Sequence, residues 1–291
     1  MPLNNLKNMV QAMQLSVEKL RPFEGHPFQV KDDAEMEQLV WSILTQGLLT
    51  PITVRPLATD EYEVISGHRR LHACQKAGIE TVPALITDMN RDAATIALVD
   101  SNLHREKILP SEKAFAYKMK LEAMNRQGQR TDLTSAQVGR KLETAEIIGE
   151  QSGESRNQVR RYIRLTNLIP GILQKVDEGR IALTPAVELS YLTDAEQEDL
   201  LETMESEDCT PSLSQAIQMK TLSQSGQLDM DKIFSIMTQP KANQQEKISF
   251  KVSELRDFFP RHYTAAQMMQ EIKMALKERQ QRLARQRDHS R

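Results

Sequence analysis

The stretch Tyr62-Glu63-Val64-Ile65-Ser66-Gly67-His68-Arg69-Arg70-Leu71-His72-Ala73 joins a strand-like run to a helical pattern through a single glycine. Its β-branched pair favours a strand, and two arginines open the helical pattern that follows. Glycine lets the backbone approach a ligand, a helix start presents unpaired N–H groups, and arginines add forked positive charge. The stretch therefore predicts an anion site with a phosphate group as its ligand. The alternative is an ordinary turn whose arginines lie in solvent.

The residues around this stretch predict a small sheet with helices packed on it. A helix is expected after Asp32, with Glu35 three residues later as a capping box, and Gly47 ends it. Strands are expected at 51–55, 61–66 and 82–86, and helices at 68–77 and from about residue 93. This strand–helix–strand order predicts an α/β unit.

Beyond Pro110 nearly the whole chain has helical patterning. Polar stretches at 127–132, 223–227 and 240–247 predict an exposed loop, a hinge and a linker. A short strand is expected at 249–252, and one long helix from Thr264 to about Arg287. The predicted fold class is α+β and mostly helical, with a tail at 1–15 and boundaries that give segments 16–107, 108–222 and 228–291.

The composition excludes several classes of protein. The 291 residues contain only 4% aromatic side chains and two distant cysteines, Cys74 and Cys209. Reduced thiols fit a cytoplasmic protein, and the first 14 residues do not resemble a signal peptide. No run of about 18 apolar residues predicts a membrane span. The net charge of −2 hides an uneven distribution, because residues 156–164 hold four arginines and no acid.

Residues 144–168 carry the strongest signal for DNA binding. A short helix at 145–150 is followed by a polar turn with Gly153, and Ser155 then caps a second helix. In that helix Val159 and Ile163 form the inner stripe, while arginine and amide side chains face outward. Two helices around a glycine turn indicate a helix-turn-helix whose second helix reads a major groove. The predicted DNA-binding residues are Ser155, Arg156, Asn157, Gln158, Arg160, Arg161 and Arg164. The alternative is a solvated helix with an arginine-rich face.

Several motifs in a fixed order give the chain a resemblance to the ParB/RepB superfamily of partition proteins. Residues 47–55 resemble the first box of that family, Ile65-Ser66-Gly67-His68-Arg69-Arg70 resembles its arginine box, and Ser101-Asn102-Leu103-His104-Arg105-Glu106 resembles its third box. The helix-turn-helix and the segment 168–186 complete the match. The resemblance covers about residues 16–220, whereas 228–291 do not resemble the usual C-terminal dimer domain.

The resemblance implies a CTP-switched DNA clamp. It implies a sulfiredoxin-like nucleotide-binding domain at 16–107, a helix-turn-helix domain at 108–222, a palindromic site on double-stranded DNA, a homodimer and a ParA-type ATPase as partner. A nucleoid-associated cytoplasmic protein of plasmid or mobile-element origin is expected. The implied nucleotide-binding residues are Gly67, His68, Arg69, Arg70, Ser101, Asn102 and Arg105. Asn102 is also the implied ligand of Mg²⁺.

Two departures from the family pattern change the expected chemistry. His68 stands where the family commonly has Glu, and Ser101 stands where it has a Glu that helps to bind Mg²⁺, with Asp100 one position earlier as a substitute. A hydroxyl cannot replace the charge of a carboxylate on a hard cation. With these departures, the resemblance implies CTP binding with at most slow hydrolysis and a weaker dependence on Mg²⁺.

Other interpretations stay open from the sequence. His68 and His72, four apart, form a metal pair only if a third ligand exists. Cys74 lies outside the setting that a sulfiredoxin-type enzyme requires. A regulator of a mobile element without a segregation role, and an enzyme with its chemistry in the α/β domain, are the competing functions. Met268, Ile272 and Leu276 in the last helix predict a dimer seam, with an intrachain core as the alternative.

Overall fold

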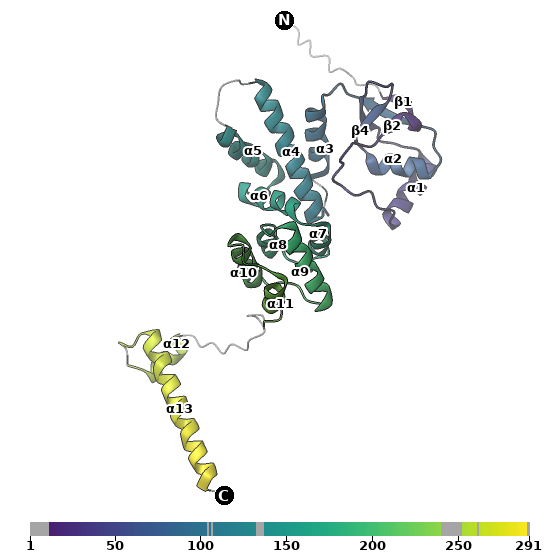
Figure 1. The fold of residues 1–291 in the computed structure, drawn as a ribbon. Coiled ribbons are helices and arrows are strands. Elements are labelled where there is room, and N and C mark those ends of the chain that lie inside the picture. Colours follow the sequence, from purple (N-terminus) through teal and green to yellow (C-terminus); the bar gives the residue numbers. More distant parts are fainter. Residues whose placement is uncertain are drawn as a thin grey trace. The chain divides into compact units, whose positions relative to one another are not determined.

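The structure is a computed structural model that describes residues 12–103, 105, 107–131, 137–239, 252–260 and 262–289. The chain divides into two compact units, residues 1–239 and 240–291, which are described separately. Along the described ranges, no helix is both long and apolar enough to cross a membrane. Figure 1 shows the ribbon.

A five-stranded mixed sheet forms the base of the N-terminal part. Its strands are β1 (Met13–Ser16), β2 (Leu20–Arg21), β3 (Ile52–Pro56), β4 (Tyr62–Ser66) and β5 (Thr81–Ile86), in the order β1-β5-β3-β4-β2. The pairs β1/β5 and β3/β4 are antiparallel, and β3/β5 and β2/β4 are parallel. Fully buried Ile52, Val54 and Val64 fill the core on one face. The three predicted strands are confirmed to within one residue.

Three helices and one short 3-10 turn complete this part: η1 (Val17–Lys19), α1 (Ala34–Gln46), α2 (His68–Lys76) and α3 (Arg91–Leu103). The predicted cap of α1 was wrong by one residue. Asp33, not Asp32, is the N-cap and its carboxylate accepts a bond from the Met36 N–H at 2.9 Å. Asp32 instead pairs with His72 and Lys76 on α2.

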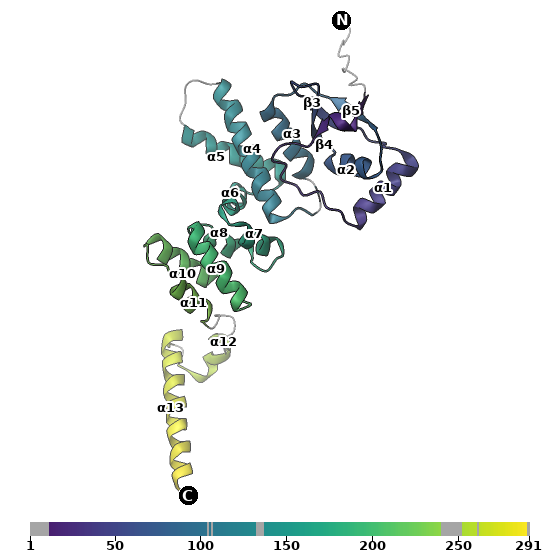
Figure 2. The ribbon, with the colours of Figure 1, turned by 45° about the vertical axis from the view of Figure 1, so that its right-hand side comes forward.

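The middle part is helical, which confirms the predicted fold class. Its elements are α4 (Pro110–Thr131), α5 (Gln137–Ser152), α6 (Arg156–Arg164), η2 (Leu165–Asn167), α7 (Pro170–Asp177), α8 (Leu183–Leu189), α9 (Asp194–Ser206), α10 (Leu213–Gln224) and α11 (Met230–Met237). Helix α4 lies between α3 and α5 in both ribbon views (Figures 1 and 2) and contacts both. Leu165, Ile172 and Leu200 anchor the core of α7 to α11.

Three local expectations were wrong. The predicted tail at 1–15 overlaps β1, because Met13 to Ser16 pair with β5 at the sheet edge; residues 1–11 lie outside the described residues. The predicted loop at 127–132 is helical through Thr131, since strong helix formers on both sides outweigh one glycine. Val252, predicted to end a strand, begins the short helix α12 (Val252–Leu255), and 249–251 lie outside the described residues.

The second unit contains α12, η4 (Arg256–Phe258) and the long helix α13 (Ala265–His289). The Tyr263 hydroxyl bonds the Glu271 carboxylate at 3.0 Å, which ties the start of α13 to the preceding turn. Met268 is buried within this unit, whereas Met269, Met274 and Leu276 are each more than half exposed. Of the predicted dimer seam, Met268 is therefore intrachain core, and Leu276 remains available on the surface.

Candidate nucleotide cavity and DNA-reading helix

Gly67 makes the turn from β4 into α2 in a conformation that other residues avoid. Its φ is +102°, in the left-handed region. A Cβ atom at this position would lie 2.8 Å from the Cγ2 atom of Ile52 and 3.0 Å from the Arg70 guanidinium. Both the backbone angle and the close packing therefore require glycine, and the predicted approach of a ligand to this backbone stays a prediction.

The two arginines that follow Gly67 have different surroundings. Arg70 turns back over the glycine, and its guanidinium donates to the carbonyls of Thr50 and Pro51 at 2.6 and 2.9 Å. Burial lowers the pKa of this guanidinium below its usual value. Arg70 thus fastens the segment before β3 to the start of α2. Arg69 points elsewhere, toward a cavity between α1, α2 and the segment before α4.

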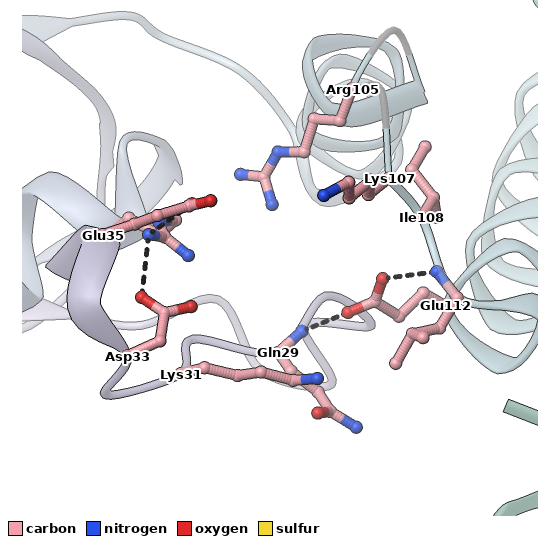
Figure 3. Close-up of a pocket in the computed structure, with 10 residues that line it drawn as sticks. Gln29, Lys31, Asp33, Glu35, Arg105, Lys107, Ile108 and Glu112 are labelled. Atoms are coloured by element: carbon pink, nitrogen blue, oxygen red, sulfur yellow. Dashed lines mark hydrogen bonds and ion pairs between the residues drawn. The ribbon is translucent and has the colours of Figure 1, made fainter. Parts of the chain in front are cut away.

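That cavity, called here the basic cavity, has a volume of about 850 Å³ and is shown in Figure 3. It is lined by Gln29, Lys31, Asp33, Glu35, Arg69, Arg105, Lys107, Ile108, Leu109 and Glu112. Four of these side chains are cationic and three are acidic, so the lining carries a net charge of +1 (4 − 3). In Figure 3, Arg105 and Lys107 lie across from Asp33 and Glu35.

The acidic residues of the basic cavity already have partners. Arg69 lies 3.5 Å from both Asp33 and Glu35, at the long limit for a hydrogen bond, so these contacts hold it weakly. The two carboxylate oxygens of Glu112 accept the backbone N–H groups of Gln29 and Leu109 at 2.8 and 3.0 Å. Asp33 and Glu112 accept backbone N–H groups, and Arg69 is held only by two long contacts, so the lining and volume of the cavity suit an anion of nucleotide size.

His68 lies under the turn instead of facing a ligand. It is buried, its Nε2 accepts the Phe23 N–H at 3.2 Å, and its ring centroid lies 3.8 Å from that of His26. Burial, with the nearby His26 and Arg105, lowers the pKa of His68 from 6.5 to about 3. A neutral imidazole that accepts a backbone hydrogen bond is a structural residue here.

His68 makes the stability of this domain depend on pH. Its folded pKa is depressed, so its contribution is present above pH 6.5 and is lost as the pH falls toward 3. We expect the free energy of unfolding to fall by about 2 kcal/mol between pH 7 and pH 5. The check is urea unfolding at both pH values for the unmodified protein, H68Q and H72Q. His72 is half-buried on α2, and H72Q is expected to keep the steep dependence. An unchanged pH dependence in H68Q would contradict the assignment.

The expected metal and third-box residues lie at the last turn of α3. Ser101 donates to the Leu98 carbonyl at 2.9 Å, and the buried Asn102 amide donates to Leu98 and Ser101 at 2.8 and 3.2 Å. Asp100, the expected substitute for a missing carboxylate, is paired with Lys120. Within the described ranges no three His, Cys, Asp or Glu side chains gather as for a metal ion, and His68 and His72 point to different partners.

Of the seven predicted nucleotide-binding residues, Arg69 and Arg105 line the basic cavity. Gly67 and Arg70 shape the turn beneath it, and His68, Ser101 and Asn102 bond to neighbouring backbone or side chains. Lys31 and Lys107 were missed. Lys107 lies two residues after the predicted Arg105, but nothing in the sequence brings Lys31 to the cavity, because the approach depends on how residues 29–33 pack on α4.

The segment predicted as a helix-turn-helix contains α5, a turn at Gly153 and α6. Gly153 has φ +71°, and a Cβ atom on Gly149 would lie 2.5 Å from the Glu154 carbonyl, so the turn packs tightly on α5. Ser155 caps α6 by accepting the Gln158 N–H at 3.2 Å. Val159 is buried with Tyr117, Ala145 and Ile148. Helix α5 is longer than the predicted 145–150, since it runs from Gln137 to Ser152.

The outward face of α6 is smaller than predicted. Arg156, Asn157 and Arg160 are exposed. The Arg161 guanidinium donates to the Thr184 hydroxyl at 2.5 Å. The expectation that Arg164 faces outward was wrong, because its guanidinium donates to Ser190 at 2.8 Å and stacks 3.9 Å from the Tyr191 ring centroid. Within residues 137–239, only part of the arginine face is therefore open to a ligand.

Comparison with known proteins gives a match over the N-terminal part. Residues 3–103 match the family model described as ParB N-terminal domain. A nucleoid occlusion protein from Bacillus mycoides is 33% identical over 159 residues, which cover 54% of this chain and 49% of the relative. The corresponding protein of Bacillus thuringiensis is 32% identical over the same length. The chain spans about half the length of the curated relatives that it matches.

Two solved structures are also similar. A C-terminally truncated chromosome-partitioning protein ParB from Caulobacter crescentus, complexed to the centromeric parS site, is 23% identical, with a TM-score of 0.43 over 73% of this chain and 99% of that chain. The same protein complexed with CTP-gamma-S is 25% identical, with a TM-score of 0.31 over 67% of this chain and 98% of that chain.

Proposed function

We propose that this chain, whose residues 3–103 match the family model described as ParB N-terminal domain, is a sequence-specific DNA-binding protein of that family and that its basic cavity binds a nucleoside triphosphate. The observation that carries the proposal is that a basic cavity and an arginine-bearing helix occur in the same compact unit. A basic cavity is present beside α2, and an arginine-bearing helix follows a helix-turn-helix turn.

The DNA-binding part of the proposal rests on the open face of α6. Arginine forks suit guanine edges and phosphates, and the Asn157 amide suits adenine. Arg156, Asn157 and Arg160 are the proposed reading residues. Arg161 and Arg164 are proposed to hold α6 on α8 and the following turn, because their guanidinium groups bond to Thr184 and Ser190. Ser155 and Gln158 are proposed to contact the DNA backbone at the start of the helix.

The nucleotide part rests on four cations that converge on one cavity. Arg69 and Arg105 are proposed to bind the phosphates, with Lys31 and Lys107 adding charge. Gly67 and Arg70 are proposed to shape the turn beside them. CTP is the first nucleotide to test, since a solved ParB protein was crystallised with CTP-gamma-S. We expect little hydrolysis and a weak dependence on Mg²⁺, because Ser101 lacks a carboxylate and Asp100 is paired with Lys120.

A homodimer on DNA follows from the small size of α6, the helix that is proposed to read the DNA sequence. One short helix reads only a few base pairs, so paired half-sites on a palindrome supply the remaining affinity. The proposed seam on α13 consists of the exposed Met269 and Leu276 and the half-buried Ile272, which follow each other at heptad spacing. Light scattering at micromolar concentration is expected to give twice the chain mass. A monomer with and without palindromic DNA would exclude the dimer.

The cellular role is proposed to be DNA partition, with a ParA-type ATPase as partner. The curated relatives are named nucleoid occlusion proteins, and a regulator without a segregation role has the same DNA-binding features. A plasmid-loss assay with and without the gene distinguishes these roles. Increased loss supports partition, whereas changed transcription with unchanged loss supports the regulator.

The experiment for the proposed function is calorimetry with CTP, ATP and GTP, in the presence and absence of Mg²⁺, and with DNA selected from a random pool. CTP is expected to bind with a stoichiometry of one per chain, and the selected DNA to show a palindromic sequence. Equal binding of the three nucleotides would contradict the choice of CTP. No nucleotide binding and no enriched sequence would contradict the proposed function.

A further inference from the structure

One lysine is buried without belonging to the basic cavity or to the reading face of α6. Lys120 lies in the middle of α4, and its side chain is 0% exposed. Its ammonium group donates to the carboxylate of Asp100 on α3 and to the side-chain oxygen of Gln151 on α5, the latter at 2.6 Å. A buried ammonium needs such partners, because water cannot reach it to replace them.

The two partners stand beside the two features that define the proposed function. Asp100 directly precedes Ser101 and Asn102 at the last turn of α3, five residues before Arg105, which lines the basic cavity. Gln151 lies two residues before Gly153, the turn that sets the direction of α6. A single charge therefore joins the end of α3 to the turn of the helix-turn-helix, with α4 between them (Figures 1 and 2).

Breaking this contact would cost the buried Lys120 more free energy than the half-exposed Asp100. The contact can therefore couple the positions of α3 and α5. If α3 moved away from α5, the ammonium would lose one acceptor while the apolar residues around α4 kept water out, which is costly. Asp100 is 45% exposed and finds water easily, so the penalty falls on Lys120. The positions of α3 and α5 are thus tied more strongly than apolar packing alone requires.

We propose that Lys120 is a positioning residue that couples occupancy of the basic cavity to the affinity of α6 for DNA. The inference rests on the proposed function. It adds that the effect of nucleotide binding on DNA affinity passes from the basic cavity to α6 through the contacts among Asp100, Lys120 and Gln151. Because coupling between two binding sites is reciprocal, nucleotide must change the DNA dissociation constant by the same factor as DNA changes that of the nucleotide.

The test measures both factors for the unmodified protein and for K120M, with CTP and the selected palindrome as ligands. Methionine keeps the apolar stem and removes the buried charge. In the unmodified protein we expect a factor on the order of tenfold in both directions. In K120M we expect each ligand to change the dissociation constant of the other by no more than about twofold. Each ligand alone is expected to bind within about threefold of its original affinity.

Two further variants keep the test decisive. K118M, on the same helix and outside the contact with Asp100 and Gln151, is expected to keep the full factor. D100N removes the charge of the half-exposed partner of Lys120 and replaces K120M in the test if K120M does not fold. In D100N the factor by which CTP and DNA change each other's dissociation constants is expected to fall at least threefold. A full factor in folded K120M or D100N overturns the inference. Two ligands that bind the unmodified protein with a factor of one overturn the inference and leave the proposed function intact. No binding of CTP or DNA overturns the proposed function itself.

Discussion

Replacing Arg156 and Arg160 together with alanine is expected to abolish sequence-specific DNA binding at moderate salt. Both guanidinium groups are exposed on the outward face of α6, and within residues 137–239 neither has an ion pair that would compete with DNA. Each lost base-edge contact costs about 1–3 kcal/mol, so the double variant should bind at least about 30-fold more weakly. Fluorescence anisotropy with the selected palindrome and a scrambled duplex is the measurement.

Salt dependence and a matched control separate base reading from charge. Arg180→Ala removes an exposed arginine of the same helical part, one that pairs with Asp208 at 3.0 Å, and should leave specific binding unchanged. If Arg156 and Arg160 contact phosphates instead of bases, the variant will lower affinity for both duplexes and reduce the salt slope by about one per lost contact. Unchanged discrimination between the duplexes would exclude α6 as the reader.

Replacing Arg69 and Arg105 together with alanine is expected to remove detectable CTP binding. The two guanidinium groups approach the basic cavity from α2 and from the segment before α4. A hydrogen bond to a charged group contributes about 1.5–3 kcal/mol, so the loss of two should weaken binding by more than about 100-fold. Calorimetry measures the affinity, and circular dichroism confirms the fold of the variant.

Lys76→Ala is the matched control for this cavity, because Lys76 lies on α2 and pairs with Asp32 on the surface. It should retain the CTP affinity of the unmodified protein. Arg70→Ala should behave differently from both, lowering thermal stability as well as CTP affinity, since Arg70 bonds the Thr50 and Pro51 carbonyls. Full CTP binding by the Arg69 and Arg105 double variant would move the nucleotide site away from the basic cavity.

The sequence by itself determined the local elements and the kinds of chemistry that they carry. Alternating and β-branched residues set the strands at β3, β4 and β5, and Gly67 marked the junction between β4 and the helix that follows. Helical spacing with a Ser155 cap set α6. These features depend on backbone angles and on neighbours three or four residues away, so they can be predicted from a single chain.

Only the tertiary structure decided where the charged side chains point. His68 and Arg70 follow Gly67 as closely as Arg69 does, yet one accepts the Phe23 N–H and the other binds two carbonyls. Lys31 reaches the basic cavity because Glu112 fastens the Gln29 backbone to α4, 83 residues away. Arg164 does not face outward with Arg156 and Arg160, because its guanidinium donates to Ser190, the residue that ends α8. Long side chains reach in several directions at similar cost, and the partner that is nearest after folding, often distant in sequence, decides which direction is taken.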